Sequence, residues 1–414
     1  MVLYRIGSAL YFATIHVFSL FNDKARLWVQ GRKDWYNQLK NCISSIPDYY
    51  KRKKVWIHVS SLGEFEQGRP VLEAIKKEYP NICIILTFFS PSGYEVRKSY
   101  PLADIVAYLP ADSPANAEGF LNLVQPDLAI WVKYDFWYYF LQELRTKNIP
   151  TVLIAAVFRK NSVFEKGILR NFYRNHILPC FTRIFVQDKD SARRLAAYYP
   201  KDKITIAGDT RYDRVIAVAS QYKDLPILPF DGITLVAGST WSKDESLLSE
   251  VYQKIKIPLR IIIAPHEIHE AHLKEIERKF NYKIVRYSQL SAYPESRLIL
   301  VDNFGLLSTL YRYGQVAYIG NGFGKHIHNL LEASVYGIPT IFGPRHHKAI
   351  EAKEHIQLGV SKEVHSAQDI ITYLEEIYQN SALRNEIRKK LHGHFAEKKG
   401  AVDKIMHEIT SYLK

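Results

Sequence analysis

The sequence predicts an α/β protein made of two successive doubly wound domains, and three observations lead to this prediction. At 414 residues the chain is too long for one ordinary core, since a domain usually holds about 100–200 residues. Short apolar, β-branched runs alternate with segments of helical apolar spacing. The alternation pauses at residues 223–232, which carry two prolines and a glycine, and then restarts.

Seven strands are predicted before this linker. Their runs are apolar on both faces, as parallel strands covered by helices on each side must be. Helical spacing fills the intervals between them, for example at 68–78 and 136–147. The predicted strands are 55–59, 82–87, 105–109, 128–132, 151–157, 183–186 and 204–207.

Five more strands are predicted after the linker, at 233–237, 260–264, 298–301, 316–319 and 340–342. We therefore expect an N-terminal anchor over 1–22, a first α/β domain over 23–222 and a second over 223–414. Sheets of this kind bind ligands beyond the carboxyl ends of their strands. Polar clusters directly after the strands are thus the candidate sites.

Composition narrows the function classes. The chain is 47% hydrophobic and 24% charged, which indicates a folded globular protein. Its three cysteines (Cys42, Cys83 and Cys180) exclude a disulfide scaffold and indicate a reducing compartment. The net charge of +14 favours an anionic partner, which is a nucleic acid, an anionic lipid or a phosphorylated substrate.

The excess charge is concentrated near the N-terminus. Residues 1–54 hold ten basic and three acidic side chains, so they carry +7, half of the total. Residues 6–21 contain no charged side chain. As a helix they extend about 24 Å, less than the ~30 Å hydrocarbon core of a bilayer. The pattern favours a membrane-inserted or interfacial anchor at an anionic surface over a signal peptide or a buried helix.

Three clusters follow strands of the first half. Ser60-Ser61-Leu62-Gly63-Glu64 places a carboxylate in a strand-to-helix turn, where it acts either as a general base or as a helix cap. Lys133 and Asp135 follow the strand at 128–132, and Arg211 follows the strand at 204–207. Asp135 is either an N-cap or a functional acid, and Arg211 either contacts phosphate or lies on a surface loop. His58 is interpreted as a structural histidine of its strand.

Further clusters follow strands of the second half. Gly238 and Ser239 precede a helix and suit either a phosphate or an ordinary N-cap turn. The glycine-rich run from Gly320 to Lys325 leads into His328, Asn329 and Glu332, and its amides and carboxylate suit a nucleotide. There is no GxxxxGK[ST] loop and no GxGxxG at the start of the first domain.

His266, His269 and His272 stand three residues apart. They make a poor zinc set, because HExxH is absent and residues at this spacing drift around a helix. We expect His266 to contact a ligand at the strand end instead.

Taken in order, these clusters resemble one family. The motifs are SSLGEF at 60–65, TFFSPSG at 87–93, YLPAD at 108–112, DFW at 135–137, GDTRYD at 208–213, AGST at 237–240, HNLLE at 328–332 and GIPTIFGP at 337–344. They resemble the 3-deoxy-D-manno-octulosonic acid (Kdo) transferases of lipopolysaccharide assembly. The resemblance runs from the N-terminal segment nearly to the end of the chain.

The resemblance implies a GT-B glycosyltransferase, with two Rossmann-like domains facing a cleft and an N-terminal membrane-anchoring helix. The donor would be CMP-Kdo and the acceptor the lipid A precursor, at the cytoplasmic side of the inner membrane, with no metal or other cofactor. Glu64 would be the general base of an inverting transfer, supported by Asp135, Lys133 and Arg211. Ser61 and Gly63 would contact the acceptor. The residues implied for CMP binding are Gly238, Ser239, Pro265, His266, Glu267, Gly320, Asn321, Gly322, His328, Asn329, Leu330, Leu331 and Glu332.

The chain departs from the family at three of these places. Lys133 stands where the family usually has an acid, and Arg211 where it commonly has a lysine. The segment from Pro265 to Glu267 aligns only in part.

Two alternatives are weighed against this interpretation. One is another GT-B enzyme that transfers or epimerises a different nucleotide sugar. The other is a membrane-tethered nucleic-acid-binding protein, which is disfavoured because no RNP-like motif is present and the 28 tyrosines are scattered. We also expect that deleting residues 1–21 weakens membrane association more than chemistry on a detergent-solubilised acceptor.

Overall fold

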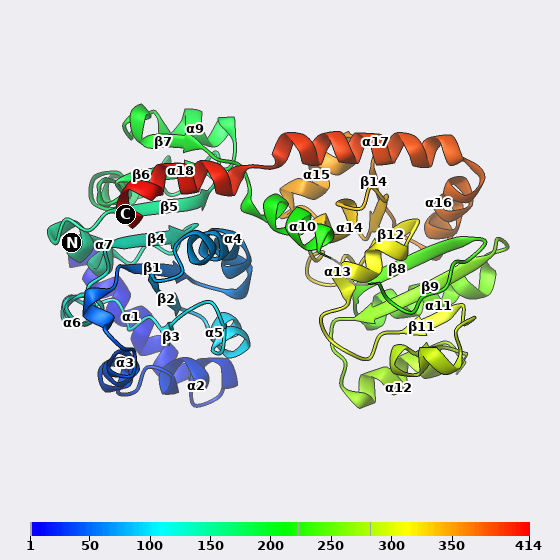
Figure 1. The fold of residues 1–414 in the computed structure, drawn as a ribbon, viewed down its shortest axis with the longest axis horizontal. Helices are drawn as coiled ribbons and strands as arrows, with labels where there is room; N and C mark the ends of the chain where they lie inside the picture. The colour runs from blue at the N-terminus through cyan, green and yellow to red at the C-terminus, as the bar shows by residue number, and fades with distance from the viewer. Residues whose placement is uncertain (1, 222–223, 282) are drawn as a thin grey trace. The chain divides into compact units, whose positions relative to one another are not determined.

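The structure is a computed structural model that describes residues 2–221, 224–281 and 283–414. The chain divides into two compact units. Unit 1 comprises residues 1–213 and 399–414, and unit 2 comprises residues 214–398. Each unit is built on one seven-stranded parallel sheet (Figure 1).

The sheet of unit 1 has the strand order β3-β2-β1-β4-β5-β6-β7. The chain forms β1 first, adds β2 and β3 on one side of it, and then adds β4 to β7 on the other side. Its central strands are buried along their whole length, which explains why they read as continuous apolar runs. The strands are β1 (Lys54–Val59), β2 (Cys83–Phe88), β3 (Ile105–Tyr108), β4 (Leu128–Val132), β5 (Thr151–Ala156), β6 (Arg183–Val186) and β7 (Ile204–Ile206).

The side chains of alternate residues in these strands pack into two separate hydrophobic cores, one on each face of the sheet. Trp56 and Trp131 point into one core, with side chains from α3, α6 and α7. Val55 and Ile57 point into the other, with side chains from α4 and α18. The helices are α2 (Asp23–Gln30), α3 (Trp35–Ser44), α4 (Leu62–Glu78), α5 (Pro91–Arg97), α6 (Pro114–Val124), α7 (Tyr138–Thr146), α8 (Arg170–Phe172), α9 (Lys189–Leu195) and α18 (Ala401–Leu413).

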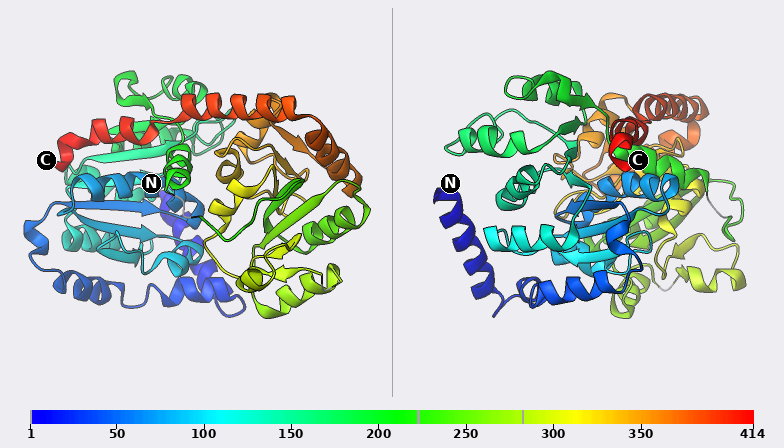
Figure 2. Two further views of the ribbon diagram at one scale, coloured as in Figure 1. Left: turned by 45° about the vertical axis from the view of Figure 1, so that its right-hand side comes forward. Right: turned by 60° about the vertical axis from the view of Figure 1, so that its left-hand side comes forward.

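The N-terminal segment forms helix α1 (Val2–Phe18), which runs along the outside of unit 1 (Figure 2, right). Tyr4 packs against the first core, whereas Ile6, Leu10 and Val17 are more than half exposed. In the described part of the chain, no helix combines the length and apolarity needed to cross a membrane. The apolar N-terminal segment thus forms a helix, as predicted. Met1 lies outside the described residues.

Unit 2 repeats the architecture with the strand order β10-β11-β9-β8-β12-β13-β14. Its strands are β8 (Ile233–Thr240), β9 (Leu259–Pro265), β10 (Val285–Arg286), β11 (Leu298–Leu300), β12 (Val316–Ile319), β13 (Thr340–Phe342) and β14 (Ser361–Glu363). Its helices are α11 (Ser242–Lys254), α12 (Glu270–Lys279), α13 (Leu307–Leu310), α14 (Leu331–Ser334), α15 (Ile350–Gln357), α16 (Ala367–Gln379) and α17 (Ser381–Lys398). The two strands that the sequence did not predict, β10 and β14, are edge strands of two and three residues, too short for a periodic signal.

The division into units differs from the predicted domain boundaries in two ways. The first change of unit falls after Asp213, inside α10 (Thr210–Ser220), and not at 222/223, where residues 222–223 lie outside the described part. The C-terminal residues 399–414 belong to unit 1, because α18 buries Ile405, Ile409 and Leu413 in its second core. A local pattern of proline and glycine does not reveal this return of the chain.

Candidate active site

Glu64 lies in the first turn of α4, directly after β1. Its Oε2 accepts a hydrogen bond from the Ser60 backbone N–H at 2.5 Å. Burial and the negative charge of Asp135 raise its pKa to about 7, against the opposing effects of the Ser60 hydrogen bond and the Lys133 charge. The two sequence interpretations of Glu64 are thus compatible, since the carboxylate caps the turn and also titrates near neutral pH.

Asp135 follows β4, the neighbour of β1 in the sheet. Its Oδ2 accepts a hydrogen bond from Trp137 Nε1 at 2.8 Å and lies 3.1 Å from His58 Nε2. The other His58 nitrogen, Nδ1, lies 2.9 Å from the Thr87 hydroxyl, so His58 links the sheet interior to Asp135. Fully buried His58 is thus structural, as expected, and one structural task is to hold Asp135.

Two cations stand at the same edge of the sheet. Lys133 has φ +63°, a backbone region that non-glycine residues seldom adopt, and its charge lowers the pKa of Glu64. Arg211 pairs with Asp209 through Nη2 to Oδ2 at 2.7 Å. Burial would raise the pKa of Asp209, but the Arg211 guanidinium outweighs it and lowers that pKa, with a smaller contribution from Lys133. The structure therefore brings the four predicted catalytic residues to one edge of unit 1.

The predicted acceptor residues flank this cluster. Ser61 is the N-cap residue of α4, but its side chain makes no capping hydrogen bond. Gly63 is exposed, and a Cβ placed there would meet no heavy atom within 4 Å. The turn in front of Glu64 therefore leaves room for a substrate group.

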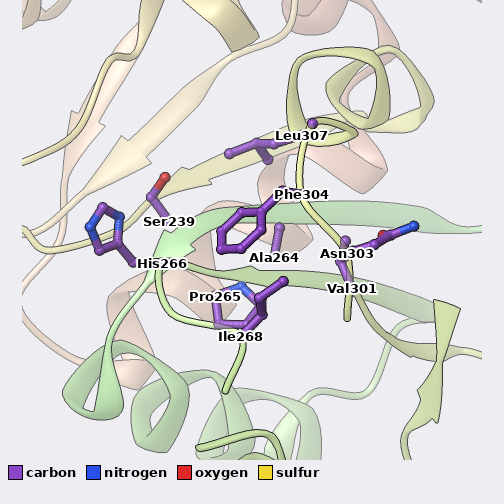
Figure 3. Close-up of a pocket in the computed structure, with 10 residues that line it drawn as sticks. Ser239, Ala264, Pro265, His266, Ile268, Val301, Asn303, Phe304 and Leu307 are labelled. Atoms are coloured by element: carbon purple, nitrogen blue, oxygen red, sulfur yellow. The ribbon is translucent and has the colours of Figure 1, made fainter. Parts of the chain in front are cut away.

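Unit 2 has a pocket of about 240 Å³ at the carboxyl ends of β8, β9 and β11 (Figure 3). Three predicted residues line it, namely Ser239, Pro265 and His266. The remaining lining comes mainly from the loop after β11, where Phe304 is 77% exposed and Gly305 has φ +90°. Figure 3 shows the Phe304 ring between Leu307 and Ala264, with His266 and Ser239 toward one end.

A stack of three rings stands beside this pocket. His266 lies against Trp241 with ring centroids 5.0 Å apart, and against His328 with centroids 4.6 Å apart. Burial, followed by the neighbouring His266 and His326, lowers the pKa of His328 to about 4, so this ring is neutral at physiological pH. Two of the three rings were predicted site residues.

The glycines near this stack serve close packing of the backbone. A Cβ at Gly238 would lie 1.9 Å from the Tyr311 hydroxyl, and one at Gly320 would lie 2.1 Å from the Ser239 carbonyl oxygen. A Cβ at Gly322 would lie 2.4 Å from the Gly343 nitrogen. The Gly320 and Asn321 N–H groups donate to Gly238 O and Asp244 Oδ2. These two amides are therefore used within the protein, and phosphate binding by the loop from Gly320 to Lys325 stays a prediction.

The remaining residues predicted to bind CMP differ in their exposure to solvent. Asn329 caps the short helix α14 through its Oδ1 and donates from Nδ2 to Glu332 Oε1 at 3.0 Å. Leu330 and Leu331 are completely buried, and the Leu331 N–H already donates to Asn329 Oδ1. Glu267 is exposed, with Oε2 lying 3.3 Å from His269 Nε2.

The three spaced histidines point to different partners. His266 joins the ring stack, His269 lies beside Glu267, and His272 Nε2 lies 3.0 Å from Glu245 Oε1. Within the ranges that the structure describes, no three His, Cys, Asp or Glu side chains are grouped as metal ligands.

Comparison with known proteins shows what this chain is similar to. Residues 33–214 match the family described as 3-Deoxy-D-manno-octulosonic-acid transferase (kdotransferase). The 3-deoxy-D-manno-octulosonic acid transferase of Aquifex aeolicus is 29% identical over 346 residues, covering 82% of this chain and 87% of that protein. The chain is thus similar to Kdo transferases over most of its length. The transferase of Haemophilus influenzae is 26% identical over 386 residues, and the match covers 87% of this chain and 87% of that protein.

The relatives that the chain resembles over most of its length are glycosyltransferases. Among solved structures, UDP-GlcNAc 2-epimerase from Neisseria meningitidis, bound to UDP-GlcNAc, matches with a TM-score of 0.60. It is 16% identical, and the match covers 86% of this chain and all of that chain. At this identity the likeness concerns the fold alone, and it agrees with the two predicted Rossmann-like domains.

Several residues near these sites were not predicted from the sequence. Phe304 follows β11 in an Asn-Phe-Gly turn, a strand-end signal that was available. Trp241 follows the predicted Gly238-Ser239 cluster directly. Trp137 was part of a quoted motif, but its hydrogen bond to Asp135 depends on the folded loop.

Proposed function

We propose that this chain transfers Kdo from CMP-Kdo to the lipid A precursor, a tetraacylated, bis-phosphorylated disaccharide, with inversion at the anomeric carbon. An acceptor hydroxyl oxygen forms the new bond to that carbon while the bond to the CMP phosphate oxygen breaks. The proton of the hydroxyl passes to Glu64, and CMP leaves with the bonding electrons. The proposal is supported by the similarity to Kdo transferases and by the chemistry of the side chains at the strand ends.

The observation that carries the proposal is the environment of Glu64. A general base works best when its pKa lies near the operating pH, and the pKa of Glu64 is raised to about 7. The negative charge of Asp135 raises the pKa of Glu64 and the positive charge of Lys133 limits this rise, so the two side chains together help to set the pKa of the base. Arg211 adds positive charge at the same edge, where it meets the anionic groups of the substrates.

Unit 2 supplies the donor site in this proposal. The apolar wall formed by Phe304, Leu307 and Pro265 suits the flat face of the cytosine base. Ser239 and His266 line the same pocket and carry the polar groups for the ribose and phosphate. Chemistry requires that the donor held by unit 2 meets the acceptor held by unit 1.

The acceptor is a membrane lipid, and α1 gives the chain a surface for the membrane. Ile6, Leu10, Val17 and Phe18 are each more than half exposed along this helix. The basic side chains of Lys24 and Arg26 follow within eight residues of its end. An apolar stripe beside basic residues favours binding in the interface of an anionic leaflet, here the cytoplasmic side of the inner membrane.

The direct test uses purified protein with CMP-Kdo and the lipid A precursor, with CMP release and product mass as readouts. We expect Kdo-containing product from the wild type. Glu64→Gln should lower turnover by about 10³-fold or more while CMP-Kdo binding stays within about twofold, because only proton transfer is lost.

The matched control is Glu78→Gln, at the exposed end of the same helix, which should keep wild-type turnover. Wild-type turnover in Glu64→Gln would refute the base assignment. CMP release with a UDP-sugar donor, or no product with CMP-Kdo, would refute the substrates.

A further inference from the structure

Helix α1 has a second face, which lies against the segment after β4. Tyr4 donates through its hydroxyl to Asp112 Oδ2 at 2.6 Å and accepts the Tyr138 backbone N–H at 3.1 Å. Two turns further along, Tyr11 and Phe12 lie against the Trp137 ring, with centroids 6.5 Å and 5.9 Å away. Both parts of this face therefore reach residues 137–138, just after Asp135.

The Trp137 ring is held from the other side by the sheet. Phe89, the residue after β2, lies with its ring centroid 4.4 Å from that of Trp137. The indole is thus enclosed between α1 and a strand end. Its N–H points to Asp135 Oδ2 at 2.8 Å, where His58 Nε2 also lies within 3.1 Å.

We infer that Trp137 is a positioning residue, whose indole N–H fixes the Asp135 carboxylate beside Glu64 and whose ring is set in place by α1. The N-terminal helix is then part of the active-site wall as well as a membrane-binding element. This inference rests on the proposed role of Glu64 as base. It adds to the expectation from the sequence that loss of residues 1–21 weakens membrane association more than chemistry, because the deletion would then also disturb the site.

The charges around the two carboxylates give the inference a measurable consequence. Glu64 faces Asp135 and Lys133, and Tyr134 is also within electrostatic reach. Asp135 faces His58 from β1, Tyr11 from α1 and Arg32 from the turn after α2. If Asp135 moves away from Glu64, the pKa of Glu64 falls, because the negative charge that raises it is more distant.

The first test compares Trp137→Phe with Trp28→Phe. Trp28 belongs to the same aromatic cluster and contacts Phe12, but its indole N–H has no hydrogen-bond partner in the described structure. Both substitutions shrink one ring, and only Trp137→Phe removes the hydrogen bond to Asp135.

We expect Trp137→Phe to lower kcat by about tenfold or more with the CMP-Kdo KM within about twofold, and to shift the acidic limb of the pH profile to lower pH. Trp28→Phe should leave both readouts near wild type. Equal behaviour of the two variants would overturn the inference.

The second test asks whether α1 acts on the site. Tyr11→Ala/Phe12→Ala removes the ring contacts to Trp137, and Ile6→Ala/Leu10→Ala makes a matched change on the outward stripe. With a detergent-solubilised acceptor, only the first double variant should show the lower kcat and the shifted limb. If both retain wild-type kcat, α1 has no positioning role.

A readout without turnover separates this inference from the proposed function. The ¹³C resonance of the Glu64 carboxyl, assigned by its loss in Glu64→Gln, reports the pKa of Glu64 directly. A lower pKa in Trp137→Phe than in Trp28→Phe supports the positioning role even if the substrates differ from those proposed. An unchanged pKa contradicts it even if Kdo transfer is found.

Discussion

At the scale of single residues, the proposed chemistry of unit 1 depends on two carboxylates placed at the ends of adjacent strands. Glu64 follows β1 and Asp135 follows β4, the two strands between which the order of the sheet changes direction. Burial and the Asp135 charge make ionisation of Glu64 costly, so its pKa is raised to about 7. The same placement that suits a base at neutral pH therefore destabilises the fold once Glu64 is ionised.

This cost predicts a pH-dependent gain of stability in Glu64→Gln. Because the pKa of Glu64 rises from 4.5 to about 7 on folding, the folded state binds more protons in that interval. The free energy of unfolding therefore falls as pH rises through it. Since Gln does not titrate, Glu64→Gln should exceed the wild type by roughly 2–3 kcal/mol above pH 7 and match it below pH 4.5.

Urea unfolding of unit 1 on both sides of this interval measures the difference. Glu78→Gln, at an exposed position of α4, should show no such pH dependence. A constant difference between Glu64→Gln and the wild type would contradict the raised pKa.

At the scale of elements, α1 carries two stripes on opposite sides. Tyr4, Phe12 and Ile15 are partly buried, whereas Ile6, Leu10 and Val17 face solvent. Since the members of each set are three, four, seven or eight residues apart, close to whole turns of a helix, each set lies on one side of α1. The partly buried stripe contacts aromatic side chains of unit 1. The other stripe is exposed, and we propose that it meets the membrane.

The outward stripe predicts the effect of added charge. Leu10→Glu/Val17→Glu should reduce co-sedimentation with anionic vesicles by about tenfold or more, because two carboxylates oppose both apolar insertion and the lipid charge. Asn41→Glu/Ser44→Glu on α3 adds the same charge at exposed positions and should have a much smaller effect. Equal loss of binding in the two variants would assign the attraction to net charge alone.

At the scale of the whole molecule, the chain leaves unit 1 after Asp213 and returns to it at residue 399. Asp213 joins the two ends of this excursion, because its carboxylate accepts hydrogen bonds from Gly400 N at 2.6 Å and Val402 N at 2.9 Å. Helix α18 then packs against α4, the helix that carries Glu64 (Figure 1). The last sixteen residues thus support the first domain.

This return predicts where a C-terminal substitution acts. Ile409→Ala should destabilise unit 1 by about 2–4 kcal/mol, since Ile409 is fully buried in its second core. Hydrogen exchange should become faster for amides of β1 and β4 and remain unchanged for those of β8 and β12. His407→Ala, exposed on the same helix, is the control. Faster exchange in unit 2 instead would contradict the assignment of α18 to unit 1.

The sequence predicted the strands of both sheets well, because buried parallel strands such as β4 and β12 are continuous apolar runs with few alternatives. From the general rule that such sheets bind ligands at their strand ends, it offered Glu64, Asp135, Lys133 and Arg211 as catalytic candidates. It did not show that the amides of Gly320 and Asn321 are used within the protein, because their partners, Gly238 and the side chain of Asp244, are far away in sequence.

The sequence by itself determined the two α/β domains, the strand-end clusters and the apolar N-terminal helix, since each depends on local periodicity and residue type. Only the tertiary structure decided that α18 belongs to unit 1, that α1 lies against Trp137, and that Phe304 lines a pocket with Ser239 and His266. These facts depend on contacts between residues separated by tens to hundreds of positions. Such contacts are selected by packing and charge in the folded chain, and no short stretch of sequence records them.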